Sequence, residues 1–248
     1  MSKVLISQSA QKSVYRDGDK AIKVFCKDFP KAEVLYEAIN TARVEELEGL
    51  NVAKVLEVSM VDGCWAITKE FIEGKTLAQL MEEDPDNVEK YLEQMVDLHL
   101  EVHSKTCPLL YKLKDKMLRQ IQELDNISEI NRYDLLTKLD SMPKHVKLCH
   151  GDFCPENIIV SKDKLYIIDW VHATQGNASA DAARTYLLLC LKDRKMADMY
   201  MDMFCRKTGT AKKYVQNWLP LVAAAQMSKK RPEEKELLTS WLNVVDYQ

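Results

Sequence analysis

The residues that could carry out chemistry gather in two short stretches of the chain. His150-Gly151-Asp152 begins the first stretch, Asn157 ends it, and Ile168-Asp169-Trp170 follows. Phosphoryl transfer from a nucleotide needs one carboxylate to accept a hydroxyl proton. It also needs an amide and a second carboxylate to hold Mg²⁺ against the phosphates. Asp152, followed five residues later by Asn157 and then by Asp169, offers this set and predicts phosphoryl transfer.

Short apolar runs flank both stretches and are expected to position them. Residues 146–149, 158–160 and 165–168 should form strands, and the polar residues 161–164 should join the last two strands as a hairpin. Asp152, Asn157 and Asp169 would then lie at strand ends near one mouth.

Size and composition indicate an ordinary globular protein. The 248 residues are enough for one large or two small domains, and 46% of them are hydrophobic while 29% are charged. A formal charge of −3, from 35 basic and 38 acidic residues, is too small to indicate nucleic acid or a membrane surface as a partner. Charge leaves the substrate and the oligomeric state open.

Cysteine usage and hydropathy predict a cytoplasmic protein. The seven cysteines form no C-x-x-C pair, and their odd number favours reduced thiols over a disulfide framework. The first ten residues have no basic region leading into a long apolar stretch, and no run is long enough to span a membrane. We therefore expect neither export nor insertion into a membrane.

A change in pattern along the chain predicts two lobes, residues 1–72 and residues 73–248. The first is expected to contain an antiparallel sheet and one helix, with strands at 4–7, 14–17, 20–25, 55–61 and 64–71 and the helix at 30–48. Thr76 should cap a short helix that ends before Pro85. Further helices are expected at 87–103, 111–124, 130–140, 180–191, 196–207, 211–227 and 233–245.

With these motifs in order, the chain resembles the aminoglycoside phosphotransferase and choline kinase family. His150 to Asn157 is similar to the family's H-G-D-x-x-x-x-N loop, and Ile168-Asp169-Trp170 is similar to its metal motif. Residues 13–16, 21–25 and 70–74 resemble its first strands and its hinge. The resemblance implies an α+β, protein-kinase-like fold and a kinase that uses ATP or GTP with Mg²⁺.

The resemblance also implies roles for single residues. Asp152 is similar to the catalytic base, and Asn157 and Asp169 to the Mg²⁺ ligands. Lys23 resembles the strand lysine that reaches the α and β phosphates. Glu37 is the best match to the helix partner of that lysine, with Glu33 as second choice.

The nucleotide would be held largely by the backbone. The resemblance implies that adenine bonds the main chain of Glu70 and Ile72, with Ile22 closing over the ring. Because no G-x-G-x-x-G occurs near residues 8–13, the phosphate cover would use Ser9, Ser13 and backbone N–H groups.

Three functions stay open at this point. The first is phosphorylation of a small-molecule hydroxyl, on an aminoglycoside, choline, ethanolamine, an amino sugar or a similar compound. The second is a non-catalytic nucleotide-binding module, and the third is an atypical protein kinase. The basic stretch 206–231 is unlike the acidic pocket expected for a polycationic aminoglycoside.

Several polar residues near the motifs have structural interpretations. His99 and His150 are expected to be buried histidines that hydrogen-bond the backbone. His103 has no carboxylate at ligand spacing in the sequence, which argues against a zinc site. Asp181 and Arg184 follow the metal motif at an expected helix start, where Asp can accept backbone N–H bonds and Arg can pair with a carboxylate.

Overall fold

A computed structural model describes residues 3–162 and 164–242. The chain groups into two compact units. The first contains Met1–Glu83 together with Pro155–His172, and the second contains Asp84–Cys154 and the chain from Ala173 onward. The segment Pro155–His172 thus groups with the N-terminal unit, whereas the sequence analysis places it in the second lobe. Each unit is described by itself.

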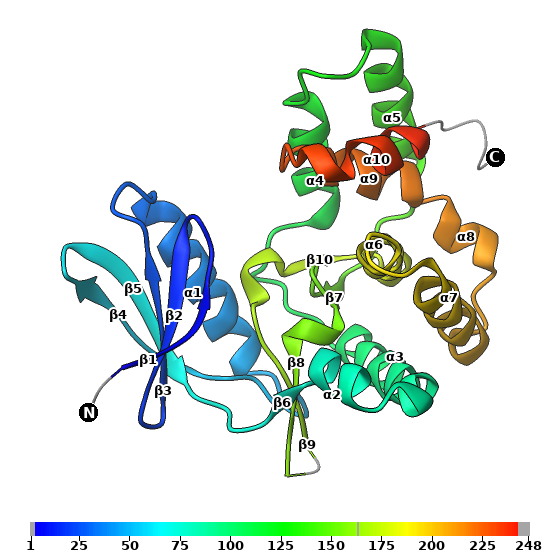
Figure 1. Cartoon of the computed structure of the whole chain (residues 1–248). Coiled ribbons are helices and arrows are strands. Elements are labelled where there is room, and N and C mark those ends of the chain that lie inside the picture. Colours follow the sequence, from blue (N-terminus) through cyan, green and yellow to red (C-terminus); the bar gives the residue numbers. More distant parts are fainter. Residues whose placement is uncertain (1–2, 163, 243–248) are drawn as a thin grey trace. The chain divides into compact units, whose positions relative to one another are not determined.

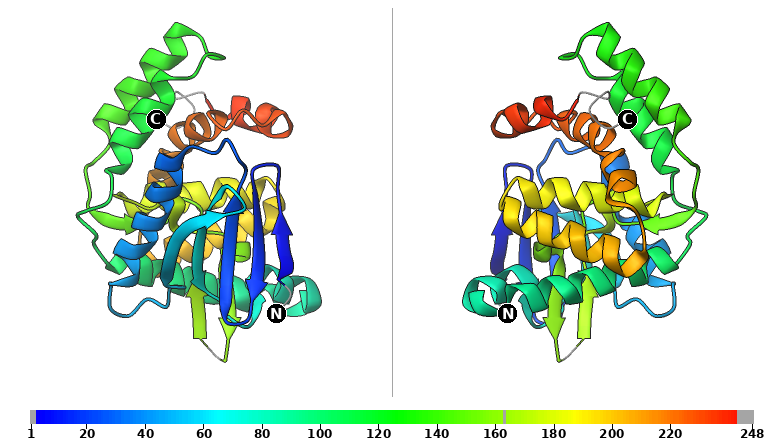
Figure 2. Two further views of the ribbon diagram at one scale, coloured as in Figure 1. Left: turned by 90° about the vertical axis from the view of Figure 1, so that its left-hand side faces the viewer. Right: turned by 90° about the vertical axis from the view of Figure 1, so that its right-hand side faces the viewer.

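An antiparallel sheet forms the first part of the N-terminal unit (Figure 1). Its strands lie in the order β1-β2-β3-β5-β4, as Figure 2 shows in its left view. The bounds are β1 Val4–Gln8, β2 Lys12–Asp17, β3 Lys20–Phe25, β4 Val55–Val61 and β5 Cys64–Glu70. Gly18 and the pair Asp62-Gly63 adopt positive φ at the two hairpin turns, which explains the Asp-Gly sequences there. Both hairpins were predicted.

Helix α1 (Lys31–Glu45) packs against β4 and β5. Phe25, Val34, Ala38 and Ile67 form the small core between helix and sheet, and each is at most 6% exposed. The helix begins directly after Pro30, whose fixed φ suits a helix start, and it ends three residues before the predicted limit at 48.

The rest of the N-terminal unit is a short helix and a second small sheet. Thr76 caps α2 (Leu77–Glu83) as predicted, because its hydroxyl accepts from the Gln79 amide while the Gln79 side chain accepts from the Thr76 amide. The hairpin of β8 (Ile158–Ser161) and β9 (Lys164–Ile167) pairs with β6 (Lys75–Thr76).

Gly74, directly before β6, permits a close approach between its own backbone and the backbone of β8. A Cβ at Gly74 would lie 2.2 Å from the carbonyl oxygen of Val160. Only a residue without a side chain fits there.

The second unit is mostly helical (Figure 1). Its helices are α3 Val88–Ser104, α4 Leu113–Gln122, α5 Glu129–Ser141, α6 Ala178–Cys190, α7 Arg194–Thr208, α8 Lys212–Gln216, α9 Leu219–Met227 and α10 Lys235–Ser240. From α3 to α7 they match the predicted ranges within two residues at each end. α6 and α7 pack side by side, as the right view of Figure 2 shows.

Two of the predicted helices need correction. The range 211–227 is divided into α8 and α9, because Pro220 lies in the first turn of α9 and cannot donate to a continuous helix. The range 233–245 is a 3₁₀ turn, Pro232–Glu234, followed by the short α10, and residues 243–245 lie outside the described residues.

Strand β10 (Thr174–Gly176) pairs antiparallel with β7 (Lys147–Cys149) and was not predicted, since Gln175 and Gly176 give it no apolar alternation. β7 ends directly before the stretch that carries Asp152, and β10 begins shortly after the stretch that carries Asp169. The pair joins the chain on either side of both stretches within the second unit.

Two further expectations can be compared with the structure. No helix within residues 3–162 and 164–242 combines the length and the apolar character needed to cross a bilayer. All seven cysteines lie in the described part of the chain, and none of them forms a disulfide bond there.

Candidate active site

The loop that carries Asp152 is held in place by one face of α6. The carboxylate of Asp181 accepts the backbone N–H of His150 at 2.7 Å on Oδ2 and that of Gly151 at 2.8 Å on Oδ1. Arg184 Nε donates to the Gly151 carbonyl at 3.3 Å, and the Thr185 hydroxyl donates to the Phe153 carbonyl at 2.9 Å. Residues at these spacings share a helix face, so α6 binds the backbone on both sides of Asp152.

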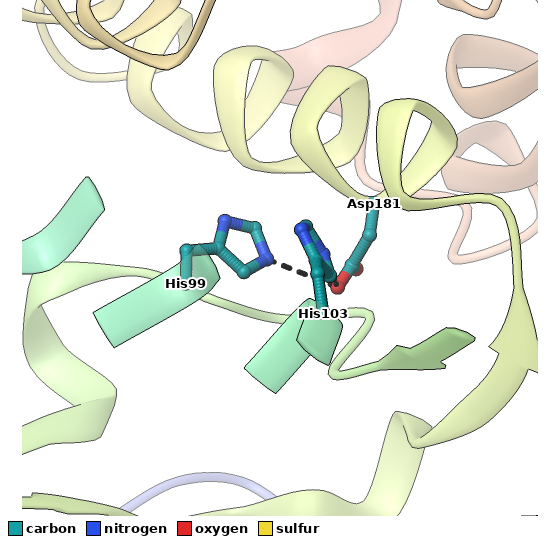
Figure 3. Close-up of side chains that lie close together, drawn as sticks. All are labelled: His99, His103 and Asp181. Carbon is teal, nitrogen blue, oxygen red and sulfur yellow. Dashed lines mark hydrogen bonds and ion pairs between the residues drawn. The ribbon is translucent and has the colours of Figure 1, made fainter. Parts of the chain in front are cut away.

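Two histidines of α3 complete the surroundings of Asp181 (Figure 3). His99 Nε2 lies 3.0 Å and His103 Nε2 lies 3.2 Å from Asp181 Oδ2, and the Tyr200 hydroxyl lies 2.7 Å from His99 Nδ1. The His99 ring also stacks on Phe153 of the loop, with ring centroids 4.0 Å apart. His99 therefore connects α3 to the loop through side chains, which corrects the expectation of a backbone partner. His150 does bond the backbone, because its Nδ1 accepts from the Asp152 N–H.

The electrostatics of this network favour a neutral His99 and an ionised Asp181. Burial and the neighbouring His103 lower the pKa of His99 to about 3. Burial alone would raise the pKa of Asp181, but the hydrogen bonds from His103 and His99 hold it well below its usual range. The ligand atoms of His99, His103 and Asp181 lie within 4.8 Å of one another, so the fold gives His103 a carboxylate neighbour that sequence spacing did not indicate. Four donors already bond Asp181, so we interpret the cluster as a hydrogen-bond network.

The second group of functional side chains lies in the N-terminal unit. Lys23 Nζ lies 2.6 Å from Glu37 Oε1 and 3.4 Å from Asp169 Oδ1. Lys23 and Glu37 are buried, at 9% and 3% exposure. The structure thus joins the β3 lysine, the α1 glutamate and the carboxylate after β9. Glu37 rather than Glu33 is the partner of Lys23.

Two further lysines belong to this group and were missed. Lys12 Nζ lies 3.8 Å from Asp169 Oδ2, and Lys69 Nζ lies 3.6 Å from Glu37 Oε1. Burial disfavours the charged carboxylate, but Lys23, Lys12 and Lys69 together lower the pKa of Asp169 below its ordinary range. Lys12 lies within the predicted phosphate cover, between Ser9 and Ser13, and this position is the signal that could have identified it.

Asn157 and Asp169 lie at the same end of the β8–β9 hairpin. Ile158 pairs with Ile167, and the Ile168 N–H donates to the Asn157 carbonyl at 2.9 Å, so the two residues flank the open end. Asp169 adopts a left-handed φ of 62°, a conformation that is uncommon outside glycine and recurs at functional sites. An ionised carboxylate and an amide oxygen are ligands that suit Mg²⁺, and lysine amines already face both Asp169 oxygens. The chemistry of Asp169 and Asn157 is thus compatible with a magnesium ion, and their role as its ligands stays a prediction.

The remaining predicted nucleotide residues occupy the same unit. Ile22 is 8% exposed on β3, and Ser13 pairs with Val24 across β2 and β3. The Ser9 hydroxyl donates to the Lys12 carbonyl at 3.2 Å, and so it stabilises the turn between β1 and β2. The Glu70 amide donates to the Lys54 carbonyl, and Ile72 follows the end of β5. Their contacts with a nucleotide stay a prediction.

The structure therefore brings most of the predicted site residues together in one unit. Lys23, Glu37 and Asp169 are in contact, and Asn157 adjoins Asp169 through the backbone bond above. Asp152 lies on the α6-bound loop of the second unit. Its approach to the other residues stays a prediction.

Comparison with known proteins adds the family. A profile described as the phosphotransferase enzyme family matches residues 4–214, which is most of the chain. The chain belongs to this family. The predicted resemblance to aminoglycoside phosphotransferases and choline kinases is confirmed, and this phosphotransferase carries the described H-G-D loop, ion pair and hairpin inside the matched range.

Curated relatives include two LicA proteins of Haemophilus influenzae. One is 26% identical to the phosphotransferase over 188 residues, which make up 70% of this chain and 67% of LicA. The other is 25% identical over 188 residues, and the match spans about half of its length, 52%.

Solved structures show the fold. The phosphotransferase is similar to aminoglycoside phosphotransferase APH(2'')-Ib with bound ADP, at a TM-score of 0.64 and 14% identity over 98% of this chain and 93% of that one. LicA in complex with AMP gives a TM-score of 0.66 at 15% identity, covering 100% and 92% of the two chains. Choline kinase LicA from Streptococcus pneumoniae gives 0.63 at 15% identity, covering 98% and 93%. The α+β, protein-kinase-like fold is thereby confirmed.

Proposed function

We propose that this phosphotransferase moves the γ-phosphate of ATP to a hydroxyl group of a small molecule with the help of Mg²⁺. The observation that carries the proposal is the buried Lys23–Glu37 pair with Asp169 in contact. The two carboxylates hold the Lys23 amine in one position and keep it charged. A cation held in this way can bind phosphate oxygens without first ordering a flexible side chain. The nucleotides named in the APH(2'')-Ib and LicA structures, ADP and AMP, support the adenine part of the proposal.

Each residue has a role in this reaction. Lys23 binds the α and β phosphates, and Glu37 keeps it in place. The Glu70 carbonyl and the Ile72 amide bond adenine, Ile22 packs on the ring, and Ser9 and Ser13 cover the phosphates. Asp152 orients the acceptor hydroxyl and accepts its proton, and transfer proceeds in line.

Asp169 and Asn157 would hold Mg²⁺. When bound, the ion neutralises charge on the phosphate oxygens and keeps them in line with the acceptor. Asp169 is already ionised before the metal binds, because the nearby lysines lower its pKa. The site needs no proton release to take up the metal.

Replacing the proposed base tests this function. We expect Asp152→Ala to lower acceptor-dependent ADP release by at least about 100-fold, since proton transfer by a positioned group contributes roughly 10²–10⁴-fold. ATP binding should change little. Asp86→Ala, which removes an exposed carboxylate, is the matched control. Undiminished turnover of Asp152→Ala would refute the role of this residue.

A non-catalytic binding module and a protein kinase are the alternatives. A module would bind ATP without turnover on any acceptor, and a protein kinase would label a protein acceptor but no metabolite. The retained Lys23, Asp152, Asn157 and Asp169 favour the enzyme, because each supplies a group that transfer requires. We propose a cytoplasmic location on the basis of the seven free thiols.

A further inference from the structure

In the second unit, three basic side chains from three different elements lie close enough to Asp152 to interact with its charge. They are Lys116 on α4, Arg184 on α6 and Lys229 in the turn after α9. α9 packs against both α4 and α6, which brings the three elements together. All three side chains are half-buried. Lysine and arginine in such positions need a physical reason, because they are ordinarily exposed.

One hydrogen bond holds Arg184 against the loop, and a second joins the elements that carry Lys116 and Lys229. Arg184 Nε donates to the Gly151 carbonyl at 3.3 Å, directly before Asp152 in the chain. Gln120 lies one turn after Lys116 on the same face of α4 and donates to the Ser228 hydroxyl at 3.3 Å, next to Lys229. The face of α4 that carries Lys116 therefore lies against the turn that carries Lys229.

The cations repel one another. Burial, followed by the charges of Arg184 and Lys229, lowers the pKa of Lys116 to about 8. Burial and Arg184 likewise lower the pKa of Lys229 to about 8, while Asp152 attracts both lysines. Four cations, Lys116, Arg184, Lys229 and Arg231, act on one another here, and three carboxylates oppose them, those of Asp152, Asp181 and Glu234.

The other acidic groups nearby are already engaged. Asp181 accepts from two backbone amides and two histidines, as described above. Glu234 accepts from Arg231 Nη1 at 2.9 Å and from the side-chain amide of Gln226. The charged groups that act on Lys116, Arg184 and Lys229 are thus Asp152, Asp181, Glu234 and Arg231 besides the three themselves.

We propose that the acceptor carries a carboxylate or a phosphate group besides its hydroxyl, and that Lys116, Arg184 and Lys229 bind this anion while Asp152 faces the hydroxyl. The inference rests on the proposed function and specifies its substrate class. An anion bound among the three cations relieves their repulsion, whereas a polycation or a quaternary ammonium group adds to it. The aminoglycoside and choline named for the structural neighbours have the wrong charge for this surface.

A set of hexoses that differ in charge tests the proposal. Glucosamine is cationic, glucose neutral, and glucuronate and glucose 6-phosphate are anionic, and ADP release with MgATP is measured for each. We expect the highest kcat/KM for one of the anionic sugars, and the comparison of the two separates a carboxylate site from a phosphate site. Preference for glucosamine, glucose or added choline would overturn the inference and leave the proposed function standing.

Charge variants test the residues. We expect Lys116→Gln and Lys229→Gln each to raise the KM for the anionic acceptor about tenfold or more, with the KM for ATP unchanged. Lys230→Gln removes the same charge from the next residue, which pairs with Asp125 at 2.8 Å, and should change neither constant. A rise in the KM for ATP alone would assign the cations to the nucleotide and refute the proposal.

A binding measurement decides the case even if no hexose is phosphorylated. Inorganic phosphate is titrated into protein saturated with Mg²⁺ and a non-hydrolysable ATP analogue, at pH 8 in two buffers of different ionisation enthalpy. We expect binding with proton uptake, because the anion raises lysine pKa values that lie near 8. The double variant Lys116→Gln/Lys229→Gln should bind at least tenfold more weakly. Equal binding by wild type and double variant would overturn the inference, whereas loss of nucleotide binding itself would count against the proposed function.

Discussion

At the scale of single residues, the charged side chains around Lys23 in the N-terminal unit are paired with one another. Lys23 lies between Glu37 and Asp169, and Lys12 approaches the second oxygen of Asp169. A buried lysine without carboxylates would lose its proton, and a buried carboxylate without lysines would gain one. The arrangement keeps both charged, as their proposed contacts with phosphate and metal require.

Lys12 provides the residue-scale prediction. We expect Lys12→Gln to weaken ATP binding about tenfold, because a hydrogen bond to a charged group contributes roughly 1.5–3 kcal/mol and Lys12 is placed to exchange Asp169 for a phosphate oxygen. The acceptor KM should stay constant. Calorimetric titration with MgATP measures the effect, and Lys27→Gln, an exposed lysine after β3, is the control. Equal affinities in both variants would exclude Lys12 from the nucleotide site.

At the scale of elements, α6 and α3 act together on the loop. α6 supplies Asp181, Arg184 and Thr185 from one face, and α3 supplies His99 and His103. Each bond goes to the backbone beside Asp152 or to the carboxylate that holds that backbone. A loop fixed in this way holds its base in one geometry, which is what positional catalysis requires.

The buried His99 makes stability depend on pH. In the folded protein its pKa is about 3, so the folded state stays neutral there while the unfolded chain takes up a proton below about pH 6.5. The free energy of unfolding should therefore fall as the pH drops below 6.5, by up to about 1.4 kcal/mol per pH unit from this residue. Urea unfolding at pH 7.5 and 5.0 measures the slope.

His99→Gln is the matched variant for this measurement. Glutamine keeps a donor for Asp181 but does not titrate, so the variant should lose less stability between the two pH values than wild type does. Any overall destabilisation cancels in the comparison, because only the difference between pH values is used. Identical slopes would show that His99 is not the group responsible.

At the scale of the whole molecule, the grouping of segments into compact units does not follow their order along the chain. The hairpin segment Pro155–His172 returns to the N-terminal unit, although Asp152 just before it belongs to the second unit. The two proposed Mg²⁺ ligands therefore group with Lys23 and Glu37, while the proposed base groups with the cations of α4, α6 and the turn after α9. We infer that nucleotide chemistry and acceptor chemistry are divided between the units in this way.

Ligand binding should stabilise the whole protein. With MgATP at about 100 times its Kd, we expect roughly 2.7 kcal/mol of added stability, which for a protein of this size raises Tm by about 5–10 °C. ATP with EDTA should give a smaller shift, since Asp169 and Asn157 would then lack the ion that links them to the phosphates. A full shift without Mg²⁺ and without turnover would favour the non-catalytic module.

The sequence by itself determined most of the elements and the residue types proposed for the chemistry. Periodicity predicted α3 to α7 within two residues at each end, and Asp-Gly turns predicted both N-terminal hairpins, because these features depend on local backbone preferences. The spacing of Asp152, Asn157 and Asp169 indicated phosphoryl transfer, since the motif is local as well. We predicted a single helix over 211–227, although Pro220 indicates that a second helix begins within this range.

Only the tertiary structure decided which distant residues meet. Nothing in the spacing of Lys12 and Asp169, or of His103 and Asp181, indicates contact, because such pairs form only when sheet register and helix packing bring their backbones together. The gathering of Lys116, Arg184 and Lys229 depends likewise on the packing of α9 against two helices far from it in sequence. Side-chain chemistry is carried by the local sequence, whereas the electric field around Asp152 arises from long-range packing.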